Sequence, residues 1–300
     1  MALCVVLMII ILASGCLGGN ESEDAWNDEV SDTNDLILAG KTSYEAYEDA
    51  LDAEQYDIAY LNIDDAIAQY EDALDNLDDL RDVAVDLDKD FLDDYLDAWE
   101  GNLNELIDIA YAGKMMALIM EYNYSRENFY DYDTPAANYF NTATASYNND
   151  LLDQAIDNAN MAYDHYAEAK GYSDRMVEIG SILEMPHVVD YANMLSASAQ
   201  YLLDACTNIV NAANLKESDV SQANQYAITV DDLIKSSKSL DEEITDLYDL
   251  YPDLYEKTNG MLFWDLFSYY QDIKNSARVA ANDYRQDMDD IVEENGDYFK

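Results

Sequence analysis

The two histidines and the internal cysteine carry the most specific chemistry in this chain. Glu184-Met-Pro-His187 has the Glu-x-x-His spacing that di-iron helical bundles use for metal ligands. Such a centre needs a second pair of this kind on an uninterrupted helix, and a proline lies inside this one. His165 fits an ordinary surface histidine, and Cys206 falls in an apolar helical stripe. We therefore predict no metal centre, no cofactor and no catalytic residue, and expect that the protein is not an enzyme.

Carboxylate groups are abundant, and most fit a solvated helix face. The run Asp86-Leu-Asp88-Lys-Asp90 is similar to the opening of a calcium loop, but a lysine lies inside it and neither the glycine nor the closing glutamate follows. A hydrolase of envelope polymers would need two carboxylates fixed ~5–10 Å apart, one with a raised pKa. The spacing selects no such pair from 64 acidic residues.

Tyrosine is the other excess, with 26 residues. Two aromatic groups lie outside the regular apolar stripes, one over residues 122–132 and one over 248–269. Beside aspartates, such rings can stack on sugars or contact a partner protein; the alternative is that they cap the ends of a bundle. The candidate contact residues are Tyr122, Tyr124, Tyr130, Tyr132, Trp264 and Tyr269.

Net charge limits the possible partners. The chain carries 64 acidic against 15 basic residues, a net charge of −49. Nucleic acid is excluded, because affinity for its phosphates comes from Lys and Arg. Charge of this size opposes folding unless ions screen it. Two explanations stay open, adaptation to high salt or binding of divalent cations, and we expect at least loosely bound cations.

The N-terminus has the pattern of an export signal. An uncharged apolar run over residues 4–12 leads into Ala-Ser-Gly-Cys16 and then into acidic residues. The run is too short to cross a bilayer of ~30 Å. This order resembles the lipobox signal of bacterial and archaeal lipoproteins. The resemblance implies a signal peptide over residues 1–15, a lipid on Cys16, and anchoring to the outer face of the cytoplasmic membrane or cell envelope.

The residues after the signal suggest a tether and a source. Residues 16–30 are predicted to be a flexible acidic tether. The start Gly-Cys16-Leu-Gly-Gly, together with many Asp and few Lys, resembles exported lipoproteins of salt-tolerant archaea. An ordinary signal peptide that leaves Cys16 as a free thiol is the alternative.

Asn20 and Asn123 begin N-x-S sequons in segments predicted to be irregular, and both are candidates for glycosylation.

Apolar residues follow a helical period along nearly all of the chain. One stripe runs from Tyr56 to Leu77 in steps of four and three, and a second runs from Leu92 to Met120 with small residues at 110–117 that would allow a close neighbour. No segment alternates as a strand does. The fold class is therefore all-α, with long amphipathic helices packed mostly antiparallel in a bundle or hairpin array.

Glycine and proline mark the expected helix ends. Pro186 and Thr134-Pro135 should open helices, Lys170-Gly171 and Asn259-Gly260 should end them, and Pro252 should break one. About seven helices result, with the longest irregular stretch over 122–133. We expect one helical domain over residues 31–300, with two lobes, 31–123 and 134–300, as an alternative.

A faint internal similarity links two of these helices. Asp65-Ala-Ile67 can be laid over Gln154-Ala-Ile156, and the first resembles the second helix of a tetratricopeptide repeat. The other repeat residues do not recur at a period of 34.

Three functions remain open. The first is a membrane-tethered structural or protein-interaction module with a protein or surface-polymer partner. The second is a lipoprotein that presents a solute, sugar or cation to a membrane partner, which predicts a cavity lined by a tyrosine cluster. The third is the carboxylate-based hydrolase described above.

Overall fold

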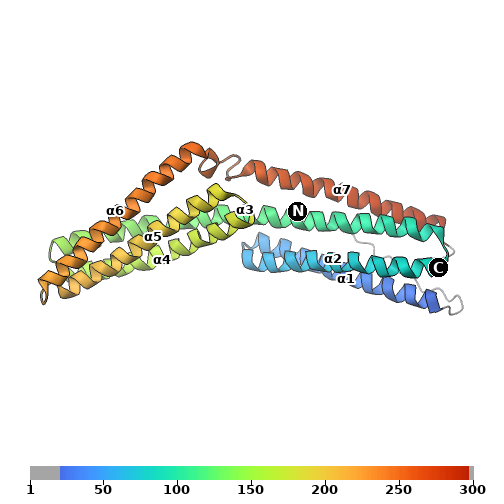
Figure 1. The fold of residues 1–300 in the computed structure, drawn as a ribbon, viewed down its shortest axis with the longest axis horizontal. Coiled ribbons are helices and arrows are strands. Elements are labelled where there is room, and N and C mark those ends of the chain that lie inside the picture. The colour runs from blue at the N-terminus through green and yellow to red at the C-terminus, as the bar shows by residue number, and fades with distance from the viewer. Residues whose placement is uncertain (1–20, 297–300) are drawn as a thin grey trace. The chain divides into compact units, whose positions relative to one another are not determined.

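The described residues, 21–296, fold into α-helices joined by short turns in the computed structural model (Figure 1), which confirms the predicted all-α class. The calls on residues 1–15, Cys16 and Asn20 lie outside this part of the chain. The helices are α1 (Glu21–Asp52), α2 (Tyr56–Leu87), α3 (Asp90–Asn148), α4 (Leu152–Ile182), α5 (Pro186–Leu215), α6 (Val220–Leu250) and α7 (Trp264–Glu294), with a 3₁₀ turn η1 (Pro252–Leu254) after α6.

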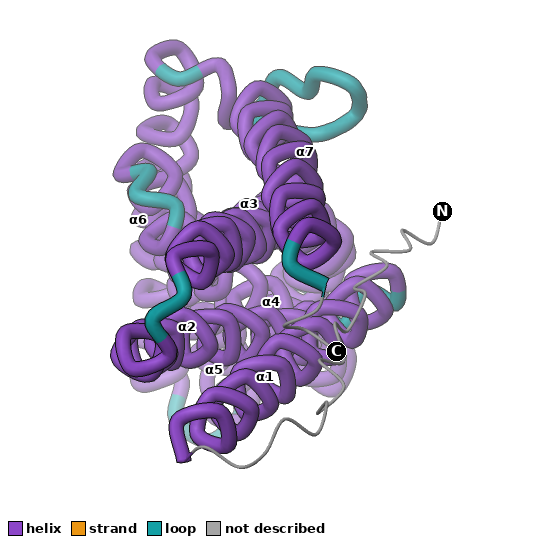
Figure 2. The backbone as a smooth tube through the Cα atoms, turned by 90° about the vertical axis from the view of Figure 1, so that its right-hand side faces the viewer, coloured by secondary structure: helices purple, strands orange, loops and turns teal. Residues whose placement is uncertain are grey.

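The helices form two compact units. Unit 1 contains the described residues up to Ala117 and from Leu266, and unit 2 contains Leu118–Asp265. Unit 1 therefore holds α1, α2, the first part of α3 and α7, while unit 2 holds the rest of α3 with α4, α5 and α6. This division differs from the alternative of lobes over 31–123 and 134–300, because α7 packs with the N-terminal helices. Figure 2 shows α7 alongside α3.

Residues 21–30 are helical, so the predicted flexible tether is wrong for this stretch. α1 begins at Glu21, and Trp26 and Val30 are 3% and 4% exposed in the core of unit 1. Burial of two large apolar side chains stabilises the first turns of α1 despite their acidic neighbours.

Three helix-to-helix turns share one backbone arrangement. Each places an acidic residue in the left-handed region: Glu54, Asp150 and Glu184 have φ of 57°, 60° and 54°. The next amide then donates to the carbonyl five residues back, as Gln55 N does to Ala50 O at 2.9 Å. This is the Schellman arrangement. The next helix begins two residues after the left-handed one, so consecutive helices form antiparallel hairpins.

Unit 1 packs around the predicted stripes. Residues 56–77 and 92–117 contribute much of its core. Tyr47 lies against Gly113, where its hydroxyl donates to the Gly113 carbonyl at 2.7 Å. The small residues predicted over 110–117 thus admit a close neighbour. Gly40 faces the Tyr70 ring, and a Cβ there would lie 2.5 Å from a ring atom.

Unit 2 has an alanine-rich core that brings its helices close together. Its fully buried alanines include Ala136, Ala143, Ala155, Ala159, Ala162 and Ala205. Polar contacts with buried partners also link its helices. Arg175 on α4 donates to both carboxylate oxygens of Glu121 on α3 at 2.7 and 2.9 Å, and Ser198 bonds Ser237 between α5 and α6 at 2.8 Å.

Several predicted boundaries are wrong, and two are confirmed. α5 begins at Pro186 and α6 ends before Pro252, as predicted. The irregular stretch over 122–133, the start at Thr134-Pro135 and the stop at Lys170-Gly171 all lie inside helices. Packing of Ala136 and of the neighbouring core residues outweighs the loss of one hydrogen bond at the proline. Asn259 and Gly260 have positive φ, but in the loop before α7 rather than at a helix end.

The helices are too long for tetratricopeptide repeats. α2, α4 and α5 span 32, 31 and 30 residues, whereas that repeat fits two helices into 34 residues. Among the described helices, none has the length and apolar character needed to span a membrane.

Candidate functional site

The aromatic residues of α3 in unit 2 separate into two groups because the helix is buried on one side. Tyr122 is fully buried and packs against Phe263 in the loop before α7, and Tyr130 is half-buried and faces α5 and α6. Tyr124 and Tyr132 lie against α4. We predicted that all four lie in one loop. The helix instead divides them between an inward cluster, with Tyr122 and Tyr130, and an outward cluster, with Tyr124 and Tyr132.

The inward cluster is a triangle of tyrosine hydroxyls from three helices. Tyr130 Oη lies 2.8 Å from Tyr191 Oη and 3.3 Å from Tyr248 Oη, and Tyr248 donates to Tyr191 at 3.0 Å. Each hydroxyl can donate once and accept within such a ring. The triangle therefore ties α3, α5 and α6 together at one level of unit 2.

Arg126 supplies the charge of this inward cluster. Its guanidinium carbon lies 5.2 Å from the Tyr130 ring centre, and no ion pair joins it to a carboxylate within residues 21–296. Burial lowers the pKa of Arg126, but the neighbouring Tyr191 and Tyr130 hydroxyls more than offset this, so the pKa is raised overall. Burial raises the pKa of Tyr130 to about 12. The arginine thus stays charged and the phenols stay protonated near neutral pH.

The loop after α6 packs onto this cluster through its aromatic and polar side chains. The His187 ring stacks on Tyr251 at 4.6 Å, and its Nε2 lies 3.1 Å from Asp253 Oδ2. Phe263 packs edge-on against Tyr122 at 5.2 Å. His187 therefore orders the loop that leads to α7, and Glu184 lies in the turn before it, so the Glu-x-x-His spacing does not form a ligand pair on one helix.

Asn123 is already engaged in the fold. Its Oδ1 accepts from Leu262 N at 2.8 Å, and its Nδ2 donates to Leu262 O at 3.3 Å and to Ile119 O at 2.8 Å. The prediction that this sequon lies in an irregular segment is wrong, because Asn123 is in the middle of α3. A glycan on Nδ2 would require these bonds to break.

The outward cluster is a row of five rings along α3 and α4, which we call the aromatic ladder. Successive ring centres lie 6.3 Å apart for Tyr124 and Tyr172, 5.8 Å for Tyr172 and Tyr132, 5.9 Å for Tyr132 and His165, and 5.6 Å for His165 and Tyr139. The His165 and Tyr139 rings are nearly parallel, at 11°. Tyr124 is 36% exposed, and the other four residues are half-buried.

Helical spacing explains the aromatic ladder. Positions 124, 132 and 139 recur every eight or seven residues on α3, and positions 165 and 172 are seven apart on antiparallel α4, so their side chains share one helix face. Sequence reasoning missed Tyr172 and Tyr139 because the stretch 122–133 was assigned to a loop. The seven-residue interval is the signal that would have found them.

Trp264 and Tyr269 belong to neither cluster. Trp264 is half-buried at the start of α7 in unit 2. Tyr269, in unit 1, is 59% exposed and packs edge-on against Tyr270 at 5.3 Å. The six predicted contact residues are therefore not one surface, and Tyr124 and Tyr132 are the two that lie together on the outside.

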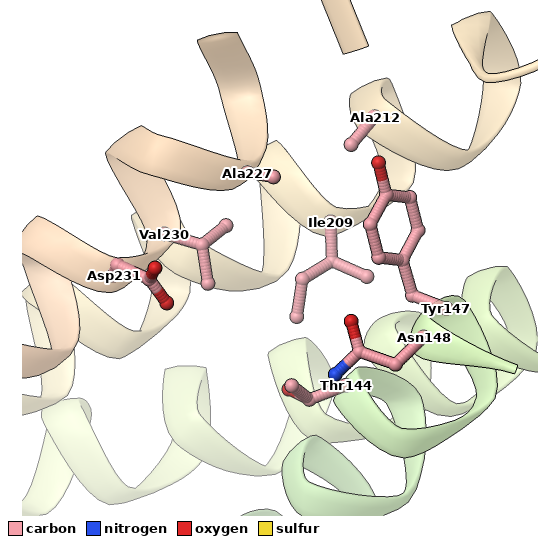
Figure 3. Close-up of a pocket in the computed structure, with 8 residues that line it drawn as sticks. All are labelled: Thr144, Tyr147, Asn148, Ile209, Ala212, Ala227, Val230 and Asp231. Carbon is pink, nitrogen blue, oxygen red and sulfur yellow. The ribbon is translucent and has the colours of Figure 1, made fainter. Parts of the chain in front are cut away.

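A small cavity lies elsewhere in unit 2, between α3, α5 and α6 (Figure 3). Its volume of about 120 Å³ has room for a few waters, against ~300–1,000 Å³ for typical ligand pockets. The residues around it are Thr144, Tyr147, Asn148, Ile209, Ala212, Ala227, Val230 and Asp231. None of them belongs to the predicted tyrosine clusters.

The titratable groups of the described residues can be compared with what a metal site or a reactive thiol or carboxylate requires. No group of three or more His, Cys, Asp or Glu residues is placed to hold a metal ion in residues 21–296. Burial raises the pKa of the Cys206 thiol to about 12, which fits a packed side chain. Burial, and then the charge of Asp241, raises the pKa of Asp133 to about 6. This pair of carboxylates does not line the described cavity.

Comparison of the chain with protein-family models, curated proteins and solved structures finds no match.

Proposed function

We propose that this protein is an exported helical lipoprotein that acts, without catalysis, as a structural or protein-interaction module at the outer face of the cytoplasmic membrane or cell envelope. The lipobox-like signal over residues 1–15 supports the anchoring at Cys16. A lipid with two acyl chains would hold it stably, whereas one chain binds a membrane only marginally. The high acidity supports adaptation to a salt-rich exterior.

The aromatic ladder is the observation that carries the interaction role. Tyrosine rings give a large contact area at a low cost in conformational entropy and are enriched at binding hot spots. Their polar edges remain available because the five residues are half-buried or exposed. Asp164 and Glu168, both exposed, lie close to His165 on α4. Electrostatic complementarity then favours a partner with a basic rim around an apolar or planar centre.

Site-specific photocrosslinking in the native membrane tests the interaction role. A benzophenone amino acid would replace Tyr132 or Tyr172 in the aromatic ladder, or Tyr163 as a matched control. Tyr163 is 43% exposed, and it lies nine residues from Tyr172, on the opposite face of α4. We expect the same discrete protein or polymer adduct from both ladder positions and none from the control. No adduct, or equal adducts from all three positions, would refute the role of the aromatic ladder.

Replacement of Cys16 tests the anchor separately. The unchanged chain should appear in the membrane fraction and incorporate a labelled lipid precursor, while Cys16→Ser should lose the label and be released. If Cys16→Ser stays in the membrane fraction and the unchanged chain takes up no label, the lipoprotein assignment is wrong.

The two other functions have less support. Solute presentation predicts a cavity lined by one of the tyrosine clusters, whereas the cavity in unit 2 has only Tyr147 among its tyrosines and is small. Hydrolysis needs a carboxylate pair in a cleft. Asp133 and Asp241 supply a raised pKa, but no described cavity adjoins them.

A further inference from the structure

Two basic side chains of α7 share one carboxylate of α1 in unit 1. Lys274 Nζ lies 3.6 Å and Arg278 Nη2 lies 3.9 Å from the same oxygen of Glu48, Oε1. Lys274 and Arg278 are four residues apart on one helix, a spacing at which like charges repel. This group therefore carries an excess of positive charge in a chain whose net charge is −49.

The contacts to Glu48 are too long for hydrogen bonds. Both exceed the ~2.7–3.2 Å of a normal N–H···O bond. Most other cations of the described chain lie closer to their partners, as Lys114 does to Asp64 at 2.6 Å, although Lys41 and Glu45 are 3.8 Å apart. The side chains of Lys274 and Arg278 are only 13% and 24% exposed, so water replaces the missing bonds only in part.

Two shielded donors in the same group make no hydrogen bond of normal geometry. Tyr44 is 7% exposed, and its hydroxyl lies beside the Arg278 side chain, whose own Nε is likewise buried and makes no such bond. Lys274 Nζ lies 5.4 Å from the centre of the Tyr44 ring. Unmet donors of this kind are destabilising, and they are rare in folded proteins. Several donors around excess positive charge point to a missing acceptor that carries negative charge.

We propose that Tyr44, Lys274 and Arg278 form a binding site for a small oxyanion, of the class of inorganic phosphate, sulfate or a simple carboxylate. Such an anion can accept hydrogen bonds from the phenol, the ammonium and the guanidinium at once. It also balances the positive charge of Lys274 and Arg278 that Glu48 alone does not neutralise. Water could meet the hydrogen bonds but not the charge. Burial, and then the charge of Arg278, lowers the pKa of Lys274, and a bound anion would counter both effects.

Phosphate binding to the full chain in detergent is the test. Phosphate would be added at millimolar concentration against chloride at constant ionic strength, because sulfate and phosphate stabilise most proteins only at much higher concentration. We expect a saturable rise in the unfolding temperature and a matching signal in isothermal titration calorimetry. The absence of both would overturn the proposal.

Three variants assign the site, and two control for their side effects. Lys274→Gln and Arg278→Gln should weaken phosphate binding by about tenfold or more, the value of one charge-assisted hydrogen bond. Tyr44→Phe should weaken it too, with little effect on the stability of the phosphate-free chain, because the phenol makes no hydrogen bond of normal geometry there. Lys114→Gln removes a paired cation of unit 1, and Tyr47→Phe removes a bonded hydroxyl next to Tyr44. Both controls should bind phosphate like the unchanged chain. If instead the three site variants bind phosphate normally, the proposal is wrong.

Discussion

Asn123 and Leu262 are joined by a pair of hydrogen bonds between a side-chain amide and a backbone peptide, 2.8 Å and 3.3 Å long. The bonds fix the end of the loop before α7 to the middle of α3. Asn123→Ala should destabilise unit 2 by about 1–3 kcal/mol, because the partly buried Leu262 amide loses its acceptor. Chemical denaturation measures this, and limited proteolysis should show faster cleavage over 251–263.

Asn128→Ala is the control for that change. Asn128 lies on the same helix, and its amide donates only to the Tyr124 carbonyl one turn earlier. Its loss should leave the loop as protected as before. A glycan on Asn123 in the native protein, seen by mass spectrometry of the tryptic peptides, would contradict the described packing.

Arg175→Met should destabilise unit 2 by about 3 kcal/mol, since it leaves the buried carboxylate of Glu121 without its bidentate partner. Glu121 is 5% exposed, so little water can take the place of Arg175. The double change Arg175→Met with Glu121→Leu should recover much of the loss, because it removes the unpaired charge. Denaturant titration of the single and double variants completes the cycle.

An exposed pair provides the comparison for this cycle. Lys235 and Asp232 lie 2.9 Å apart with side chains 73% and 67% exposed. Lys235→Met should leave the free energy of unfolding nearly unchanged, because water screens this exposed pair. If Arg175→Met and Lys235→Met lower the free energy of unfolding by similar amounts, burial of Glu121 does not increase the cost of losing its basic partner.

Protonation of the half-buried Asp133 carboxyl should make the folded protein more stable in mild acid than at neutral pH. Its pKa is raised from 3.8 to about 6 by burial and then by Asp241. The folded state therefore binds a proton that the unfolded state releases between these values, so this stabilisation is present below pH 4 and is lost as the pH rises through 6. Asp133→Asn, which keeps a neutral side chain, should be more stable than the unchanged chain at neutral pH by up to about 3 kcal/mol, and equal to it near pH 4.

The control for this pH dependence is Asp131→Asn, which removes one exposed charge from the same helix. Relief of general repulsion affects Asp131 and Asp133 alike, so only a difference between the two variants reports on burial. Equal pH profiles for both variants would show that Asp133 titrates like a surface carboxylate.

Salt should stabilise the fold through screening. At an ionic strength of about 1 M the Debye length is ~3 Å, short enough to remove most repulsion within a net charge of −49. We expect the unfolding temperature to rise strongly between low salt and molar KCl. Millimolar calcium at matched ionic strength separates the two explanations, because a large shift there would mean specific cation sites. The chain used should start at residue 17, since Trp26 and Val30 belong to the core.

Periodicity predicted the helices well where each had a single buried stripe. The stripe from Leu92 to Ala117 lies in the core as expected. The stretch 122–133 failed because its aromatic residues occupy two faces of α3, so no single stripe marks it as helical. A helix with aromatic residues on two faces shows no single apolar stripe, so its sequence can be mistaken for that of an aromatic loop.

Helix ends were predicted only where proline enforced them. Glu54, Asp150 and Glu184 hold the left-handed positions at which glycine or asparagine is typical, so nothing in the local sequence marked these turns. Lys170-Gly171 looked like a stop, yet the neighbouring Ala169 and Ser173 are buried and hold α4 together there. Among the site residues, Tyr124 and Tyr132 were found from composition. Their partners on α4 depend on tertiary contacts that one sequence does not reveal.

α7 belongs to unit 1, but in the sequence all of unit 2 comes between α7 and the other helices of unit 1. The order of synthesis and the order of assembly therefore differ. Residues 118–265 are complete as soon as α6 and its loop have emerged, but Ala277, Ala281 and Met288 reach the core of unit 1 only at the end of translation. Until then the earlier helices expose the apolar surface that α7 will cover. A stop codon just after the loop would thus leave unit 2 whole and unit 1 without α7, and the exposed surface would lie on helices far from the stop codon in the sequence.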